Sequence, residues 1–156
     1  MAYQDAFEQF LGELGREVGI SDLQFDENRF CHITVDDEFP VSLRCDVEEH
    51  RFIILGQIVS DLPDVMNREL IELLLEQGQG PLCDNGIGIA FERSTRNLIL
   101  YQFIPLATLN LERMKTILHK FFEAVKTWRK RLAYPASDKS VSRSLDSALI
   151  SPYGYL

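Results

Sequence analysis

The sequence predicts an α+β domain with the element order α-β-β-β-α-β-β-α, in which a twisted, mainly antiparallel sheet packs on helices. The spacing of an amphipathic helix, three or four residues between apolar positions, recurs at 3–18, 61–77 and 111–132. Between these segments lie short runs rich in apolar residues, at 29–35, 40–46, 51–59, 87–92 and 98–104. Polar turns connect several of these runs, which favours hairpins and therefore antiparallel pairing.

The first predicted helix runs from about Tyr3 to Val18 and carries one apolar stripe, with its acidic residues outside that stripe. Gly19 follows as a C-terminal cap, because glycine readily adopts the left-handed conformation in which many helices end. The stripe consists of Tyr3, Phe7, Phe10, Leu11, Leu14 and Val18.

The strands predicted at 29–35 and 40–46 form a hairpin around the acidic turn 36–38. Neighbouring residues of a strand point to opposite faces, so Cys31 faces the core while Phe30 and His32 face the outer side. The third strand, 51–59, is apolar on both faces. Such a strand is covered on both sides, or it keeps one face that binds something.

The second helix is predicted to open at Ser60-Asp61-Leu62-Pro63, with Asp61 as the N-cap and Pro63 in the first turn. It runs to about Gln77 and stops at Gly78. Its apolar residues spread over more than one face, which is a wider stripe than a helix lying on one sheet requires.

A second hairpin and a third helix complete the predicted domain. The runs at 87–92 and 98–104 flank the polar turn 93–97, and the helix at 111–132 carries an apolar seam that Pro135 ends. We therefore expect one domain over residues 1–134, followed by a flexible, serine-rich tail over 135–156.

The composition is that of one globular domain of 156 residues, 46% apolar and 26% charged. The net charge of −8 argues against a nucleic-acid partner, and the basic stretch 126–131 fits better as charge that complements a helix C-terminus. No apolar run is long enough to span a bilayer and the N-terminus lacks a signal pattern, so we expect a soluble protein without membrane insertion. Three cysteines without CxxC spacing favour a reducing cytoplasm.

No residue pattern predicts catalysis or a bound ion. Cys31 and His32 are neighbours on one strand and cannot form a dyad, so a small buried thiol is the better interpretation of Cys31. A metal site of His32 with His50 or Asp46 has no ligand spacing to support it. Phosphate-binding and hydrolase motifs are absent from the sequence. We therefore expect a protein that is not an enzyme and uses no cofactor and no metal.

Apolar residues in excess of one small core instead predict a protein that binds polypeptides, including a second copy of itself. The wide stripe of the second helix and the strand after it place the homodimer interface at Leu70, Leu74, Ile87 and Ile89. The outer side of the first strand and one face of the third place a partner-binding surface at Phe30, His32, Ile53 and Leu55.

Several local patterns resemble the class I type III secretion chaperones, the Tir-chaperone (CesT) family. The stretch from Leu23 to Cys31 resembles that family's F-x-E-N-x-x-C lead-in to its first strand, and it continues into an acidic turn and a matching second strand. Gly80-Pro81-Leu82 resembles the family's turn before the next hairpin, and the stretch 103–106 resembles its strand-to-helix junction. The resemblance covers about residues 5–132.

This resemblance implies a dimeric fold of the secretion-chaperone type and a homodimer in the bacterial cytoplasm. Such a protein binds the N-terminal segment of one or more secreted effectors before export, keeps it extended, and uses no nucleotide cycle. Apolar side chains of the effector would lie in surface pockets, in some members with a strand added to a sheet edge. The secretion-system ATPase is a further partner that the resemblance suggests.

Two other classes of function stay open at this point. A dimeric small-molecule-binding or regulatory domain predicts a defined internal pocket with a ligand, whereas a chaperone predicts co-purification with an unfolded effector segment. A cytoplasmic hydrolase that uses Cys31 or Cys83 is the weaker alternative.

Overall fold

The computed structural model describes residues 5–35, 39–59 and 62–133, and it confirms the predicted order of elements. The helices are α1 (Ala6–Val18), α2 (Arg68–Gln77) and α3 (Leu111–Ala133). The strands are β1 (Phe30–Val35), β2 (Phe39–Asp46), β3 (Arg51–Val59), β4 (Gly88–Glu92) and β5 (Asn97–Pro105). Short 3-10 turns, η1 (Gly80–Leu82) and η2 (Leu106–Thr108), follow α2 and β5. The predicted tail, 135–156, and the acidic turn, 36–38, lie outside the described residues.

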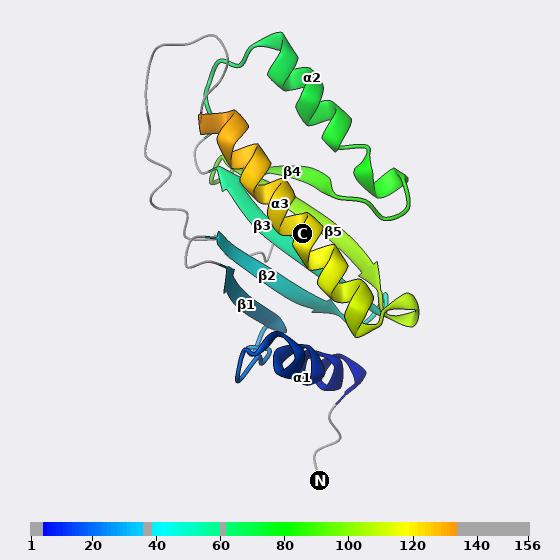
Figure 1. Ribbon diagram of the computed structural model, residues 1–156. Helices are drawn as coiled ribbons and strands as arrows, with labels where there is room; N and C mark the ends of the chain where they lie inside the picture. The colour runs from blue at the N-terminus through cyan, green and yellow to red at the C-terminus, as the bar shows by residue number, and fades with distance from the viewer. Residues whose placement is uncertain (1–4, 36–38, 60–61, 134–156) are drawn as a thin grey trace.

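One antiparallel sheet has the strand order β1-β2-β3-β5-β4 (Figure 1). The last strand in the chain, β5, therefore lies between β3 and β4, and β3 has a neighbour on each side. The helices α1 and α3 contribute to one apolar core on one face of this sheet, with α3 crossing β3 and β5 (Figure 1). We call the opposite side of the sheet the outer face.

Close packing of α3 against the sheet depends on a glycine in β3. A Cβ atom placed on Gly56 would lie 2.9 Å from Cε1 of Phe121 and 3.0 Å from Cγ2 of Val125. Both of these α3 side chains are fully buried, as are Phe52 and Ile54 on the same side of β3. The missing side chain at Gly56 therefore lets the helix lie directly on the middle of the sheet.

Side-chain hydrogen bonds and ion pairs hold the turn before β1 and explain its polar sequence. Asp26 accepts hydrogen bonds at Oδ1 from the backbone N–H of Asn28, at 2.8 Å, and of Phe30, at 2.9 Å. Arg29 adopts a left-handed backbone with φ of 65° and forms an ion pair with Glu8, Nη1 to Oε1, at 3.1 Å. A second ion pair joins Arg29 to Asp5, the N-cap of α1. The turn thus ties α1 to the first strand.

The prediction for the start of the second helix is wrong. The helix begins at Arg68, where Asn67 caps it by accepting the backbone N–H of Leu70 at Oδ1, at 2.8 Å. Asp61 lies outside the described residues, and 62–66 precede the helix. Arg96, from the turn between β4 and β5, donates from Nη2 to the carbonyl oxygen of Leu62 at 2.6 Å and to Oδ1 of Asp64 at 2.9 Å. These long-range bonds hold the segment in a non-helical path.

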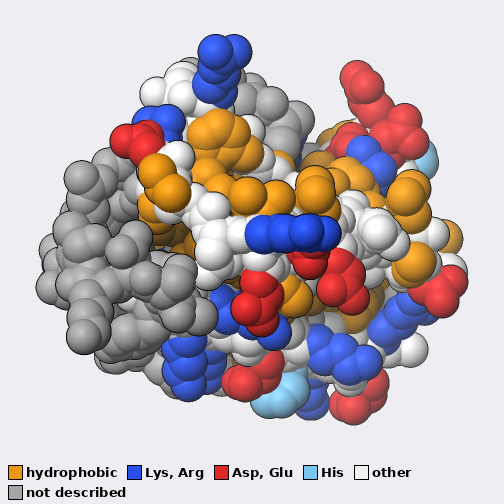
Figure 2. Space-filling view, turned by 90° about the horizontal axis from the view of Figure 1, so that it is seen from above, with side chains coloured by type: hydrophobic (Ala, Val, Ile, Leu, Met, Phe, Trp, Pro, Cys, Tyr) orange, Lys and Arg blue, Asp and Glu red, His pale blue; other side chains and the backbone are white. Residues whose placement is uncertain are grey.

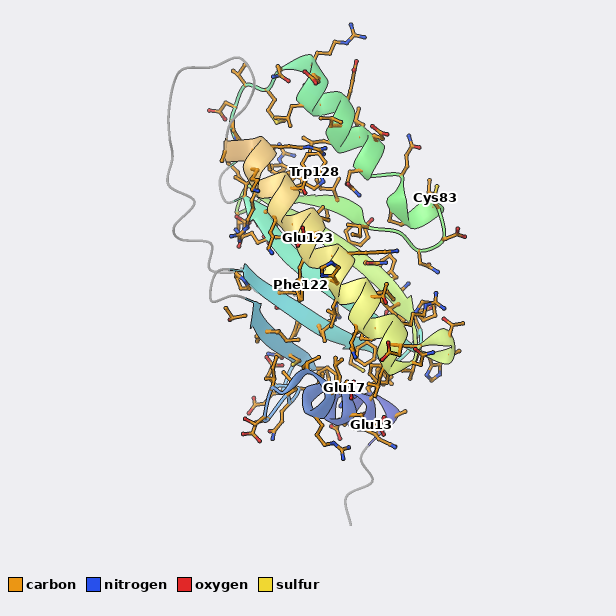
Figure 3. All side chains as sticks on the ribbon, viewed as in Figure 1. Glu13, Glu17, Cys83, Phe122, Glu123 and Trp128 are labelled. Carbon is orange, nitrogen blue, oxygen red and sulfur yellow. The ribbon has the colours of Figure 1, made fainter. Side chains whose placement is uncertain are left out.

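Hydrogen bonds also fix where α2 lies. Trp128 of α3 lies beside α2 (Figure 3) and donates from Nε1 to Oε1 of Gln77 at 3.0 Å. Gln77 in turn donates from Nε2 to the carbonyl oxygen of Ile87, just before β4, at 2.7 Å. One glutamine therefore joins α2, α3 and the start of β4. Within the described ranges, every helix is too short or too polar to cross a bilayer.

Candidate functional site

The register of the sheet brings all four predicted partner-binding residues to the outer face. Residues that pair directly across antiparallel strands share a face. One row across the sheet consists of Phe30, Arg44, Ile53 and Phe103, and the next consists of His32, Ser42, Leu55 and Tyr101. The prediction that Phe30 lies on the same face as Ile53 and Leu55 is confirmed.

The apolar residues of this face form a cluster separate from the main core. Its buried members are Phe30, Ile53, Leu55 and Ile99, and Tyr101 and Phe103 pack against them half-buried. In the described part of the chain, this outer cluster contains strand residues alone, whereas the main core draws on all three helices. Phe30 is 9% exposed and Leu55 is 0% exposed, so the face is a second, thin core rather than the open apolar surface we expected.

Arginine and histidine side chains border the outer cluster. The guanidinium of Arg51 lies 4.1 Å from the ring centre of Phe103, and that of Arg44 lies 5.7 Å from the ring centre of Phe30. The His32 ring is parallel to the Phe30 ring at 6.1 Å between centres, and its Nδ1 lies 2.8 Å from Oγ of Ser42. With 60% of its side chain exposed, His32 is the most accessible of the four predicted residues.

The sequence did not indicate that β5 contributes to this site. Ile99, Tyr101 and Phe103 have the right alternation, yet both faces of that strand are apolar, so alternation alone did not select one. Their role depends on β5 lying next to β3, which is a long-range pairing. Arg44 and Ser42 were detectable in principle, because they share the alternation of the outward residues of the predicted second strand.

The predicted dimer residues all belong to the main core or pack against it, but they differ in accessibility. Leu70 is buried in the main core, while Leu74, Ile87 and Ile89 are half-buried against it. The exposed apolar residues of α2 are Ile71, at 41%, and Leu75, at 69%. These two are four positions apart and so share one side of the helix. Viewed from the side on which α2 lies, hydrophobic side chains gather between charged ones (Figure 2).

The three cysteines occupy two kinds of environment. Cys31 and Cys45 are buried in the main core, as the alternation of their strands predicted. Burial raises the pKa of the Cys31 thiol to about 11, and it also raises the pKa of Cys45. Cys83 is exposed on the turn after α2 (Figure 3). Among the described residues, no three His, Cys, Asp or Glu side chains gather in a way that could hold a metal ion.

The raised pKa of Cys31 predicts a pH-dependent stability. Between about pH 9 and 11 the unfolded thiol ionises while the folded thiol keeps its proton. The stabilisation is complete below pH 9 and is lost as the pH rises through the folded pKa, by about 1.4 kcal/mol per pH unit. Urea unfolding at pH 8 and pH 10.5 measures this loss. A Cys31→Ala variant should lose less stability over that interval, and an identical loss in both proteins contradicts the prediction.

The described fold is an antiparallel sheet with helices on one face and a second apolar cluster on the other. The family model of the Tir chaperone protein (CesT) family matches residues 9–129. The chain therefore belongs to this family, as the residue patterns before the first strand and after the second helix suggested.

Solved structures with the same fold are type III secretion chaperones. The HopA1–SchA chaperone–effector complex matches with a TM-score of 0.69 and 22% identity, over 80% of this chain and 93% of that chain. The ExsC–ExsE complex matches with a TM-score of 0.70 and 21% identity, over 88% and 100%. The Yersinia pestis chaperone SycH, solved with a fragment of YscM2, matches with a TM-score of 0.65 and 13% identity, over 79% and 99%. No curated protein matches this sequence.

Proposed function

We propose that this protein is a non-catalytic chaperone that binds the N-terminal segment of one or more type III secreted effectors and keeps it extended before export. It acts in the bacterial cytoplasm, and the secretion-system ATPase is a further partner. Membership of the Tir chaperone family supports this function. The main support for the location of the site is the outer cluster, a set of apolar strand residues separate from the main core.

The binding surface proposed for the effector is the outer face, with Phe30, His32, Ile53 and Leu55 as its contacts. Two ladder rows present apolar and aromatic groups side by side there, with His32 exposed at one end. An extended segment places alternate side chains on one side, so its apolar residues can pack along these rows. Each such side chain removed from water contributes roughly 1.5–3 kcal/mol, partly offset by the entropy lost on ordering the segment.

The test of this function begins with the native partner. Purification of the tagged chain from its own cytoplasm, followed by mass spectrometry, should recover a secreted protein. Its N-terminal segment, produced separately, should bind the full chain in calorimetric titration without nucleotide. A secreted protein whose N-terminal segment shows no heat of binding, while its remaining domain does, would contradict the proposal.

We also infer that the protein is a homodimer and that α2 and the strand after it form the interface. The half-buried residues Leu74, Ile87 and Ile89 provide its floor, and the exposed Ile71 and Leu75 extend it outward. Leu70 supports this surface from the main core. The hydrogen bonds of Gln77 to Trp128 and to Ile87 hold the surface rigid, so that little ordering accompanies association.

We expect Leu75→Glu to convert the dimer into a folded monomer. Leu75 is 69% exposed, so the substitution costs the isolated chain little. A two-fold dimer repeats the substitution on both subunits, so two charges are placed in one apolar interface. Sedimentation velocity at micromolar concentration should show the monomer, with unchanged circular dichroism. Val47→Glu, an exposed apolar position before β3, is the matched control and should remain dimeric. A dimer that persists in Leu75→Glu places the interface elsewhere.

A further inference from the structure

Gln57 in β3 presents a buried polar group whose hydrogen bonds are not satisfied within the described part of the chain. The residue is 2% exposed, and neither Nε2 nor Oε1 of its side chain has a hydrogen-bond partner among the described residues. Leaving a buried donor or acceptor unpaired destabilises the fold, and folded proteins pair the great majority of such groups. A carboxamide buried without partners therefore calls for a ligand or a functional role.

The location of Gln57 links it to the proposed effector site. It pairs directly with Ile99 of the outer cluster and lies two residues beyond Leu55, so its side chain lies on the outer face. The strand is held firmly at this point, because Arg129 of α3 donates to the carbonyl oxygen of Gln57 from Nη2 at 3.0 Å and from Nε at 3.3 Å. Just after Gln57 the register between β3 and β5 shifts.

We propose that the Gln57 carboxamide is a main-chain contact for the extended polypeptide bound on the outer face. This inference rests on the proposed function and names one of its binding contacts. A carboxamide offers N–H donors and a carbonyl acceptor with nearly the spacing of a peptide group. It can therefore accept a backbone N–H and donate to a backbone C=O of a passing extended segment, while Leu55 and Ile99 contact the flanking side chains.

The chemistry of the partner follows from both ends of the face. The Gln57 end recognises a feature that every polypeptide has, its main chain, and it requires that the segment be extended with free N–H and C=O groups. The opposite end carries Arg44 and Arg51 against the Phe30 and Phe103 rings, in a chain whose net charge is −8. Arg51 is already paired with Asp46, Nε to Oδ2 at 2.9 Å, so this end does not call for an acidic residue. The partner is therefore an extended segment with alternating apolar residues.

The experiment uses the full chain and the N-terminal segment of the secreted protein that co-purifies with it. Gln57→Leu should weaken binding of this segment about tenfold, because the peptide groups opposite lose both hydrogen bonds. The urea midpoint of the free variant should equal or exceed that of the unmodified chain, since an unpaired buried amide has been removed. Gln102→Leu makes the same chemical change on the opposite face of β5 and should leave affinity unchanged.

An ester scan of the segment separates a main-chain contact from any other. Single peptide N–H groups of the segment are replaced, one at a time, by ester oxygens. At one position the replacement should lower the affinity for the unmodified chain about tenfold, and the affinity for Gln57→Leu less than twofold. The inference is overturned if Gln57→Leu binds the segment as tightly as the unmodified chain does. It is also overturned if each ester replacement lowers the affinity equally for both proteins. A lowered urea midpoint overturns it as well, because this would show that the amide is already paired in the free chain. If truncating Phe30 and Tyr101 also leaves affinity intact, the proposed effector site itself fails.

Discussion

Truncation of two aromatic residues on the outer face, Phe30→Ala with Tyr101→Ala, should weaken binding of the effector segment by 100-fold or more. The two side chains lie on adjacent ladder rows, Phe30 buried and Tyr101 half-buried in the outer cluster. Each truncation removes a surface against which an apolar side chain of the segment packs. At roughly 1.5–3 kcal/mol for each side chain of the segment left in water, the two losses total at least about 3 kcal/mol, and each 1.4 kcal/mol is a factor of ten. Calorimetric titration of the effector segment measures the loss.

Because Phe30 is buried, this double variant also loses stability, and the control has to match that loss. Met114→Ala removes a fully buried side chain of α3 from the main core and costs about 2–5 kcal/mol of stability. It leaves the outer face untouched, so it should bind the segment normally at a temperature where both variants are folded. A third variant, His32→Glu, changes an exposed side chain without disturbing the core. If the double variant, Met114→Ala and His32→Glu all bind the segment as tightly as the unmodified chain, the effector binds elsewhere on the protein.

Gly80→Ala should cost several kcal/mol of stability, a large effect for the addition of one methyl group. A Cβ atom on Gly80 would lie 1.8 Å from the carbonyl oxygen of Ile87 and 2.6 Å from its carbonyl carbon. Both are backbone atoms, so no side-chain rotation relieves the contact. The carbonyl oxygen of Gly80 also accepts the N–H groups of Cys83 and Gly86, so the turn cannot move without losing both bonds. We expect a loss of about 3 kcal/mol, the upper part of the usual range for overpacking.

Gly12→Ala is the matched control for this prediction. Gly12 lies inside α1, and a Cβ atom there would meet nothing within 4 Å. Alanine should stabilise the helix by about 0.5–1 kcal/mol, because glycine loses more backbone freedom on folding. Urea unfolding curves should therefore shift in opposite directions for the two glycines. An unchanged midpoint in Gly80→Ala would show that Gly80 and Ile87 do not lie in contact in solution.

The order of elements could be predicted from local patterns, but the start of α2 could not. Leu62, Val65 and Met66 continue the helical spacing backward, and Pro63 is acceptable in a first turn. The structure starts the helix at Arg68 instead, because Arg96 binds the backbone of Leu62 and the carboxylate of Asp64. A contact between residues about thirty positions apart decided a boundary that local spacing left open.

Local patterns predicted some residues of the outer face, but not those that reach it through long-range strand pairing. Strand alternation placed Phe30 and His32 on one side, and the doubly apolar third strand supplied Ile53 and Leu55. That these four lie together follows from two consecutive hairpins, which sequence patterns indicate well. Tyr101 and Phe103 belong to the site only because β5 inserts beside β3, and Gln57 is noteworthy only because no described residue pairs with its amide. Neither fact has a local signal.

The same insertion of β5 has a consequence for how the chain is made. Arg51 pairs with Pro105, so the apolar β3 cannot gain its second neighbour until the ribosome has synthesised everything between them. Until then a strand that ends up buried along nearly its whole length keeps one open edge in the nascent chain. Contacts this distant in sequence form slowly, and unpaired apolar edges invite aggregation. Translation pauses or premature stops before residue 105 should therefore be especially damaging, with nascent fragments that need protection of their own.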